Sequence, residues 1–286
     1  MVATDLVRMK IVHTCEELDK ALAGVCLHSR EFVPTMGALH AGHISLVRHA
    51  RGRDGTVVAS VFVNPTQFND REDLRRYPRT PESDLEMLRE AGADVVFMPS
   101  EKEIYPEPDS RVFDFGLLDK VMEGATRPGH FNGVAQVVSR LFDLVRPARA
   151  YFGEKDFQQV AVVREMVRQM AMPVEIVALP TVREADGLAM SSRNALLTEA
   201  QRVAAPLIYK ALTAGAARIG EMQPAEVERF VTDMIDSDPA LDVIYFNLVN
   251  RRTLERISDW AKAADGVQGC VAVRAGNVRL IDNLRF

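Results

Sequence analysis

The chain has 286 residues, of which 47% are hydrophobic, and this is enough apolar material for one large domain or two smaller ones. The net charge of −5 argues against nucleic acid as a partner, because nucleic-acid binders usually carry a basic surface, and no apolar stretch approaches the length that spans a membrane. The three cysteines form no C-x-x-C pair and the N-terminal segment has no signal-peptide core, so we expect a cytoplasmic protein without disulfides.

Through about residue 180, short apolar β-rich runs alternate with amphipathic helical patterns. The clearest helix is 81–90, which has Thr80 as a candidate N-cap, Pro81 at its first position and Gly92 just past its end. Strands that alternate with helices indicate βαβ units and a parallel sheet covered on both faces. We therefore predict a Rossmann-like α/β domain over residues 1–183, with strands at 31–35, 56–63, 94–98, 150–152 and 174–178.

The pattern changes after about residue 183. Two helical segments, 199–220 and 224–236, precede strands at 243–249 and near residues 271 and 278. Helices followed by strands predict a smaller α+β domain over residues 184–286. No low-complexity linker separates the two, so we place a short hinge within residues 179–187.

The strongest chemical signal follows the first predicted strand, in the sequence PTMGALHAGH at residues 34–43. A strand end, a glycine-bearing turn and a helix start form the usual ligand site of an open α/β sheet. His40 and His43 are three residues apart and share a face of the first helical turn, where exposed N–H groups also favour anions. This pattern suits phosphate, although a helix start with two incidental histidines explains it equally well. Neither a P-loop nor a G-x-G-x-x-G motif is present, so a nucleotide would bind by other means.

Four further polar segments, at 64–68, 127–134, 151–159 and 186–194, contain candidate binding residues. Each segment alone is also explained by a solvated turn, a helix cap or plain core. Four of the five segments follow predicted strands or lie at the hinge, which is where α/β proteins collect functional residues.

Taken together and in this order, the motifs resemble those of the pantothenate synthetases, also called pantoate–β-alanine ligases. The resemblance runs from about residue 32 to residue 283 and rests on PTMGALHAGH, VFVNPTQF, YPRTPESD, RPGHFNGV, YFGEKDFQQ, PTVREADGLAMSSRN and the terminal RLIDN. That family belongs to the H-x-G-H nucleotidyltransferases, which include the class I aminoacyl-tRNA synthetases. The sequence MSSR at 190–193 resembles the second signature of those synthetases, with Arg193 as its cation.

The resemblance implies a two-step reaction. Pantoate and ATP would give pantoyl-adenylate and pyrophosphate, and β-alanine would then displace AMP to give pantothenate. Mg²⁺ on the phosphates, a homodimer and a small domain that acts as a lid are implied as well. Two alternatives stay open: another H-x-G-H adenylate-forming or nucleotidyl-transferring enzyme, and a non-catalytic ATP-binding regulator.

The resemblance also assigns roles to single residues. His43 would be the principal catalytic donor, supported by His40, Lys155 and Arg193. Gln67 and Gln159 would bind pantoate, and Val134, Val137, Val138 and Phe68 would cover its methyl groups. No Mg²⁺ ligand can be assigned, and Asp84 is one candidate. The residues expected to contact ATP are Met36, Gly37, Ala38, Leu39, His40, Ala41, Gly42, His43, Gly153, Glu154, Lys155, Asp156, Val182, Met190, Ser191, Ser192 and Arg193.

Overall fold

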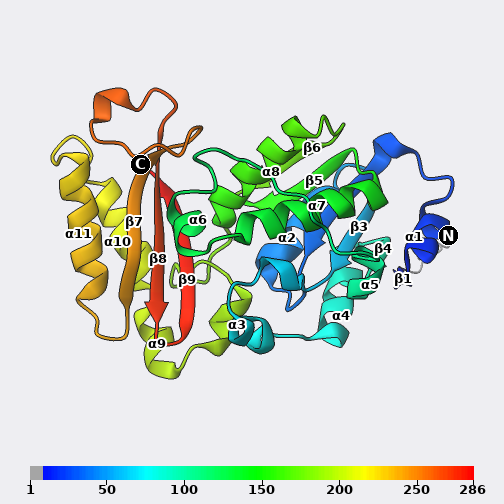
Figure 1. Ribbon diagram of the computed structural model, residues 1–286. Helices are drawn as coiled ribbons and strands as arrows, with labels where there is room; N and C mark the ends of the chain where they lie inside the picture. The colour runs from blue at the N-terminus through cyan, green and yellow to red at the C-terminus, as the bar shows by residue number, and fades with distance from the viewer. Residues whose placement is uncertain (1–8) are drawn as a thin grey trace, which may run out of the picture. The chain divides into compact units, whose positions relative to one another are not determined.

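The computed structural model describes residues 9–286, and the chain divides into two compact units (Figure 1). The first, called the large unit, extends to Phe113 and also contains Gly129–Gly153 and Val163–Leu179. The second, called the C-terminal unit, contains Asp114–Pro128, Glu154–Val162 and Pro180–Phe286. Two segments that precede residue 183 therefore group with the C-terminal unit. Residues 1–8, the start of the segment in which we expect no signal peptide, lie outside the described residues.

The large unit is built on a six-stranded parallel sheet with the order β1-β4-β3-β2-β5-β6. The five predicted strands are confirmed, and β1 is an additional edge strand that the sequence did not reveal. Strand β2 pairs with β3 on one side and with β5 on the other, so the chain reverses its direction of travel through the sheet there. Open α/β sheets bind ligands at the carboxyl ends of strands at such a point. The strands are β1 (Lys10–Val12), β2 (Arg30–Thr35), β3 (Thr56–Val61), β4 (Val95–Phe97), β5 (Arg149–Gly153) and β6 (Glu175–Leu179).

Helices cover both faces of this sheet. Phe32 and Val33 are adjacent in β2 and point to opposite faces. Val33 packs in a buried cluster with residues of α2 and α4, whereas Phe32 makes an edge-on ring contact with Phe142 of α7 at 6.2 Å. The helices are α1 (Cys15–Leu22), α2 (Ala41–Arg51), α3 (Arg71–Arg76), α4 (Pro81–Ala91), α5 (Glu101–Ile104) and α7 (His130–Val145), with the short turns η1 (Leu27–Ser29) and η2 (Pro65–Gln67); α8 (Phe157–Gln169) enters this unit at Val163.

The C-terminal unit contains a three-stranded antiparallel sheet in the order β7-β8-β9. Helices α10 and α11 contribute to its apolar core together with residues from all three strands. The predicted α+β composition, and with it the predicted fold class, is confirmed. The elements are α6 (Met122–Thr126), η3 (Glu154–Asp156), η4 (Ser192–Leu196), α9 (Glu199–Ala204), α10 (Leu207–Ala216), α11 (Pro224–Asp236), β7 (Asp242–Asn250), η5 (Trp260–Lys262), β8 (Val267–Ala275) and β9 (Val278–Arg285).

The predicted helix at 199–220 is interrupted. Helix α9 ends at Ala204, α10 begins at Leu207, and Pro206 stands between them. Proline has no N–H for the helical ladder and restricts the residue before it, which explains the break. In the described part of the chain, no helix is long and apolar enough to cross a membrane.

Candidate active site

The loop after β2 carries the H-x-G-H sequence into the start of α2. Gly37 has a φ of +80°, and a Cβ there would lie 2.9 Å from Oδ2 of Asp84 and 3.0 Å from Cγ1 of Val61. Only glycine fits this position without strain, because the left-handed conformation and the lack of space both exclude a side chain. The tight turn brings the backbone of residues 37–39 against α4 and directs the chain into α2.

His40 and His43 form a reciprocal cap on α2. His40 is the N-cap residue, and its Nδ1 accepts a hydrogen bond from the Gly42 N–H at 3.1 Å. Nδ1 of His43 accepts one from the His40 N–H at 3.4 Å, and the two rings are 4.1 Å apart between centroids. A neutral imidazole that accepts at Nδ1 carries its proton at Nε2. The cap therefore makes both rings donors at Nε2, beside a helix N-terminus that attracts anions.

Asp84 fixes the loop that precedes these histidines. It lies in the first turn of α4 and is only 1% exposed. Its carboxylate accepts hydrogen bonds from the N–H groups of Ala38 at 3.0 Å and Leu39 at 2.8 Å, and from the Thr80 hydroxyl at 3.0 Å. Both carboxylate oxygens thus bind the protein itself. The contacts indicate that Asp84 orients the loop, a role that the sequence did not reveal.

Gln67 lies in the short turn η2 after β3 and is nearly buried. Its Nε2 contacts Sδ of Met36 at 3.0 Å, so the structure brings this predicted pantoate ligand beside the H-x-G-H loop. Its Oε1 accepts a hydrogen bond from Asn64 Nδ2 at 3.3 Å, and its carbonyl contacts His130 Nδ1 at 2.8 Å. The contacts of Oε1 with Asn64 and of Nε2 with Met36 orient the side-chain amide, and the contact with His130 fixes the backbone of the turn.

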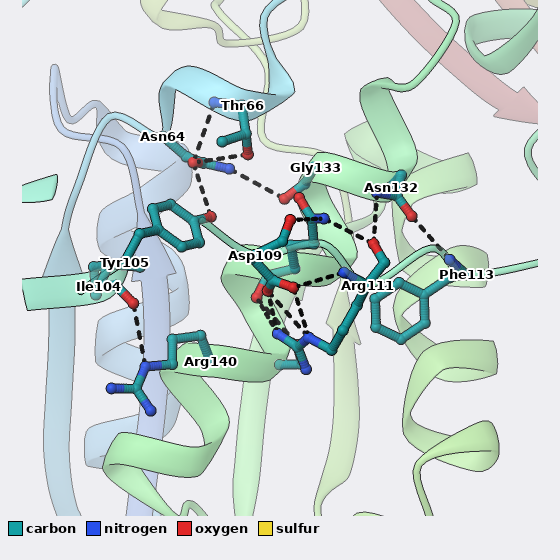
Figure 2. A network of polar contacts seen from close by, with 12 residues as sticks. Asn64, Thr66, Ile104, Tyr105, Asp109, Arg111, Phe113, Asn132, Gly133 and Arg140 are labelled. Carbon is teal, nitrogen blue, oxygen red and sulfur yellow. Dashed lines mark hydrogen bonds and ion pairs between the residues drawn. The ribbon is translucent and has the colours of Figure 1, made fainter. Parts of the chain in front are cut away.

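Asn64, which contacts Gln67, belongs to a polar network that reaches α7 and the segment after α5 (Figure 2). Asn64 donates to the Gly133 carbonyl at 3.1 Å and accepts from the Tyr105 hydroxyl at 3.0 Å. Burial raises the pKa of Tyr105, so its hydroxyl stays protonated and remains a donor. A Cβ at Gly133 would lie 2.6 Å from the Thr66 carbonyl, so glycine is needed where α7 meets this turn. The network gives the Gln67 turn a rigid support.

The apolar residues predicted to cover pantoate lie nearby in the large unit. Val134, Val137 and Val138 are all at most 5% exposed on α7, and the ring of Phe68 lies 5.8 Å from that of Tyr77. The burial of the valines is equally consistent with plain core, so their contact with pantoate stays a prediction.

The remaining predicted ligands, apart from Gly153 at the end of β5, lie in the C-terminal unit. Lys155 and Asp156 form the turn η3 with Glu154, and the Lys155 ammonium is 3.6 Å from the Asp156 carboxylate. The side chain of Lys155 is 17% exposed, which leaves its charge partly accessible. Gln159 follows in the first turn of α8 and is half-buried.

Val182 and Met190 are brought together by a narrow loop. The Met190 N–H donates to the Val182 carbonyl at 3.0 Å, and Arg183 forms an isolated antiparallel bridge with Ala189. Ser191 then caps η4 by accepting from the Arg193 N–H at 3.3 Å. The MSSR sequence therefore begins an ordered turn rather than a long helix.

Comparisons with known proteins identify what this chain is similar to. The sequence profile of a family described as pantoate-beta-alanine ligase matches residues 10–285. A pantothenate synthetase of Porphyromonas gingivalis is 55% identical over 89% of this chain and 90% of its own length, and one of Bacteroides thetaiotaomicron is 49% identical over 97% and 99%.

Solved structures agree with the sequence comparison. The pantothenate synthetase of Thermus thermophilus superposes with a TM-score of 0.90 at 49% identity, covering 96% of this chain and 99% of that one. The pantoate-beta-alanine ligase of Francisella tularensis, solved in complex with beta-gamma ATP and beta-alanine, gives a TM-score of 0.82 at 33% identity, covering 97% of both chains.

Proposed function

The chain belongs to the pantoate–β-alanine ligase family, and we propose that it joins pantoate to β-alanine with ATP, through a pantoyl-adenylate. The single observation that carries the proposal is the paired imidazole cap of His40 and His43 at the start of α2. It supplies two oriented N–H donors at a helix N-terminus, where phosphate oxygens bind well.

In the first step, a carboxylate oxygen of pantoate attacks the α-phosphorus of ATP and pyrophosphate leaves. Negative charge grows on the phosphate oxygens during this attack, and donors fixed in advance stabilise it best. His43 is the principal donor and His40 supports it, while Lys155 and Arg193 supply positive charge. The ATP contacts expected from the sequence, at residues 36–43, 153–156, 182 and 190–193, belong to this proposal.

Gln67 and Gln159 bind pantoate in this scheme. Their neutral amides can hydrogen-bond its hydroxyl groups and carboxylate without adding a charge beside the nucleophile. The buried contacts of Gln67 with Asn64 and Met36 support a fixed orientation of its amide. In the second step, the amine of β-alanine attacks the acyl carbon of the adenylate. AMP leaves with one former carboxylate oxygen, and the amine proton passes to solvent.

We propose Mg²⁺ as the companion of ATP, neutralising charge on its phosphates. Mg²⁺ usually binds through one or two carboxylates, water and substrate phosphates rather than in an all-protein cage. Among residues 9–286, no group of three or more His, Cys, Asp or Glu side chains could hold a metal ion, and no protein ligand of Mg²⁺ is assigned.

A homodimer and a cytoplasmic location complete the proposal. The homodimer follows from the resemblance of the sequence to the family, and the cytoplasmic location is the expectation drawn above from the cysteine pattern and the N-terminal segment. Sedimentation of the purified chain tests the dimer, because a monomer has a mass of 31.8 kDa.

Product analysis tests the function. AMP should form only when pantoate, β-alanine and Mg-ATP are all present, and labelled pyrophosphate should exchange into ATP when β-alanine is omitted. Pantoate with heavy oxygen in its carboxylate should deliver one labelled atom to AMP and none to pyrophosphate. ADP as the product, with label in inorganic phosphate, would refute the adenylate route, and binding of ATP without turnover would leave a non-catalytic regulator.

A further inference from the structure

The terminal motif RLIDN has no role in the reaction described above, yet its asparagine contacts the Lys155 turn. Asn283 lies in β9 and is 6% exposed. Its Nδ2 donates to the carbonyl of Glu154 at 2.9 Å and to that of Lys155 at 2.8 Å. Both carbonyls belong to η3, so one side chain binds two consecutive peptide groups of the turn that presents the lysine.

The amide of Asn283 can face only one way. Its Oδ1 accepts a hydrogen bond from Gln268 Nε2 on the neighbouring strand β8, at 2.7 Å. Nδ2 must therefore point toward the two carbonyls, because an oxygen placed there would face two other oxygens. Both protons of the amide have acceptors, and the turn is held by the polarity of this group as well as by its shape.

Asp282 fixes the same strand from within the C-terminal unit. One of its oxygens accepts a hydrogen bond from the Asn283 N–H at 2.7 Å. Its carboxylate also forms a two-point ion pair with the Arg183 guanidinium, at 2.6 and 3.0 Å, and the Asp282 side chain is only 4% exposed. Such paired contacts are geometrically demanding, so the backbone that carries Asn283 is well fixed.

We propose that Asn283 is a positioning residue for the reaction: it binds no substrate, and it sets the place of the Lys155 ammonium through the carbonyls of residues 154 and 155. This inference rests on the proposed role of Lys155. The lysine side chain is flexible, so its ammonium can stabilise a transition state well only if the backbone that carries it is fixed. Small displacements of a charged group lower the reaction rate strongly.

A double-mutant cycle tests the proposal. kcat/KM for ATP is measured for the wild-type chain, Asn283→Ala, Lys155→Ala and the double variant. Asn283→Ala should lower kcat/KM on the order of tenfold to a hundredfold, the loss expected from a misplaced catalytic group. The double variant should be no worse than Lys155→Ala alone, because residues that act through one another are not additive.

A matched control separates positioning from stability. Asn250 is also a buried asparagine of this unit, and its side chain binds Arg252, Thr253 and Asp265 instead of the turn. Asn250→Ala should lower the melting temperature and leave kcat/KM for ATP near that of the wild type. If Asn283→Ala does not fold, Asn283→Asp enters the cycle, because it keeps the size and the acceptor for Gln268 and removes the Nδ2 group that donates to both carbonyls of the turn.

The outcomes are distinct. Losses that multiply in the double variant, a fully active Lys155→Ala chain, or wild-type kinetics in the Asn283 variants each overturn the positioning role. A wild-type chain that makes no AMP from pantoate and β-alanine overturns the proposed function instead, and this is seen before any variant is measured.

Discussion

Replacement of Asp84 by asparagine should damage both the stability of the large unit and the use of ATP. Oδ1 of Asp84 accepts from Leu39 and Thr80, and Oδ2 accepts from Ala38. In the Asp84→Asn variant the single oxygen should face the two donors, which leaves the amide NH₂ opposite the Ala38 N–H. One buried backbone donor then loses its acceptor, and the remaining hydrogen bonds lose the carboxylate charge.

The magnitude follows from these contacts. An unsatisfied buried donor costs about 1–3 kcal/mol, and the loss of charge on the other bonds keeps the total near the upper part of that range. For a chain of this size, about 2–3 kcal/mol corresponds to a fall in melting temperature of roughly 3–5 °C. Because the loop leads directly to His40, we also expect kcat/KM for ATP to fall by about 10²-fold, as for a catalytic group displaced by about 1 Å.

The assay compares thermal unfolding and steady-state kinetics of Asp84→Asn with those of Asp94→Asn. Asp94 also accepts a backbone N–H, that of Val57 at 2.8 Å, and pairs with Arg51, but it has no contact with the H-x-G-H loop. Asp94→Asn should lose stability with little change in kinetics. Raising the Mg²⁺ concentration should not rescue Asp84→Asn. Equal kinetics in the two variants would refute the orienting role, and rescue by Mg²⁺ would show that Asp84 is a metal ligand.

Three further predictions concern single side chains. His43→Ala should fold normally and lose about 10²–10³ in turnover, the usual cost of one oriented transition-state donor, and activity within a factor of two of the wild type would remove His43 from the mechanism. Gln67→Ala and Gln159→Ala should each raise KM for pantoate more than KM for ATP, and equal effects on both substrates would contradict their assignment. Burial disfavours the charged form of Glu123, but hydrogen bonds and charge from Arg279, with further charge from Arg127, outweigh burial and lower its pKa below 4.5. The ionised carboxylate thus stabilises the fold above pH 4.5, and this contribution is lost as the pH falls through the pKa of Glu123 in the folded protein. The difference in melting temperature between the wild type and Glu123→Gln should therefore shrink in acid. A constant difference down to pH 3 would contradict this prediction.

The sheet of the large unit was predictable because its central strands are continuous apolar runs. β3, for example, has four consecutive buried residues, as expected for a strand covered on both faces. The edge strand β1 was not predictable, because two of its three residues are exposed and the run is too short to show a period. The break at Pro206 could have been read from the sequence, since proline there interrupts an otherwise regular apolar pattern.

The candidate site divides in the same way. The histidine pair was predictable, since glycines and a helix start lie within ten residues of it and the structure shows the two rings in contact. The residues that hold the site in place were not predictable. Asp84 lies 45 residues from its partner Leu39, and in the sequence it is equally well explained as an acidic residue in the first turn of a helix. Asn283 lies 128 residues from Lys155, and in a strand near the chain end it has no local signal at all.

Asp84 and Asn283 share a physical feature that explains why local patterns miss them. Each is a buried polar side chain that binds backbone groups of a distant loop: Asp84 accepts from two N–H groups, and Asn283 donates to two carbonyls. Backbone groups are the same in every residue except proline, so the residue types of the loop do not indicate which distant side chain binds its backbone. The side chain that binds them cannot vary so freely, because only a double acceptor suits the first loop and only a double donor suits the second. Substitutions at residues 38, 39 and 154 that keep the backbone conformation should therefore preserve these hydrogen bonds, whereas most substitutions at residues 84 and 283 should remove them.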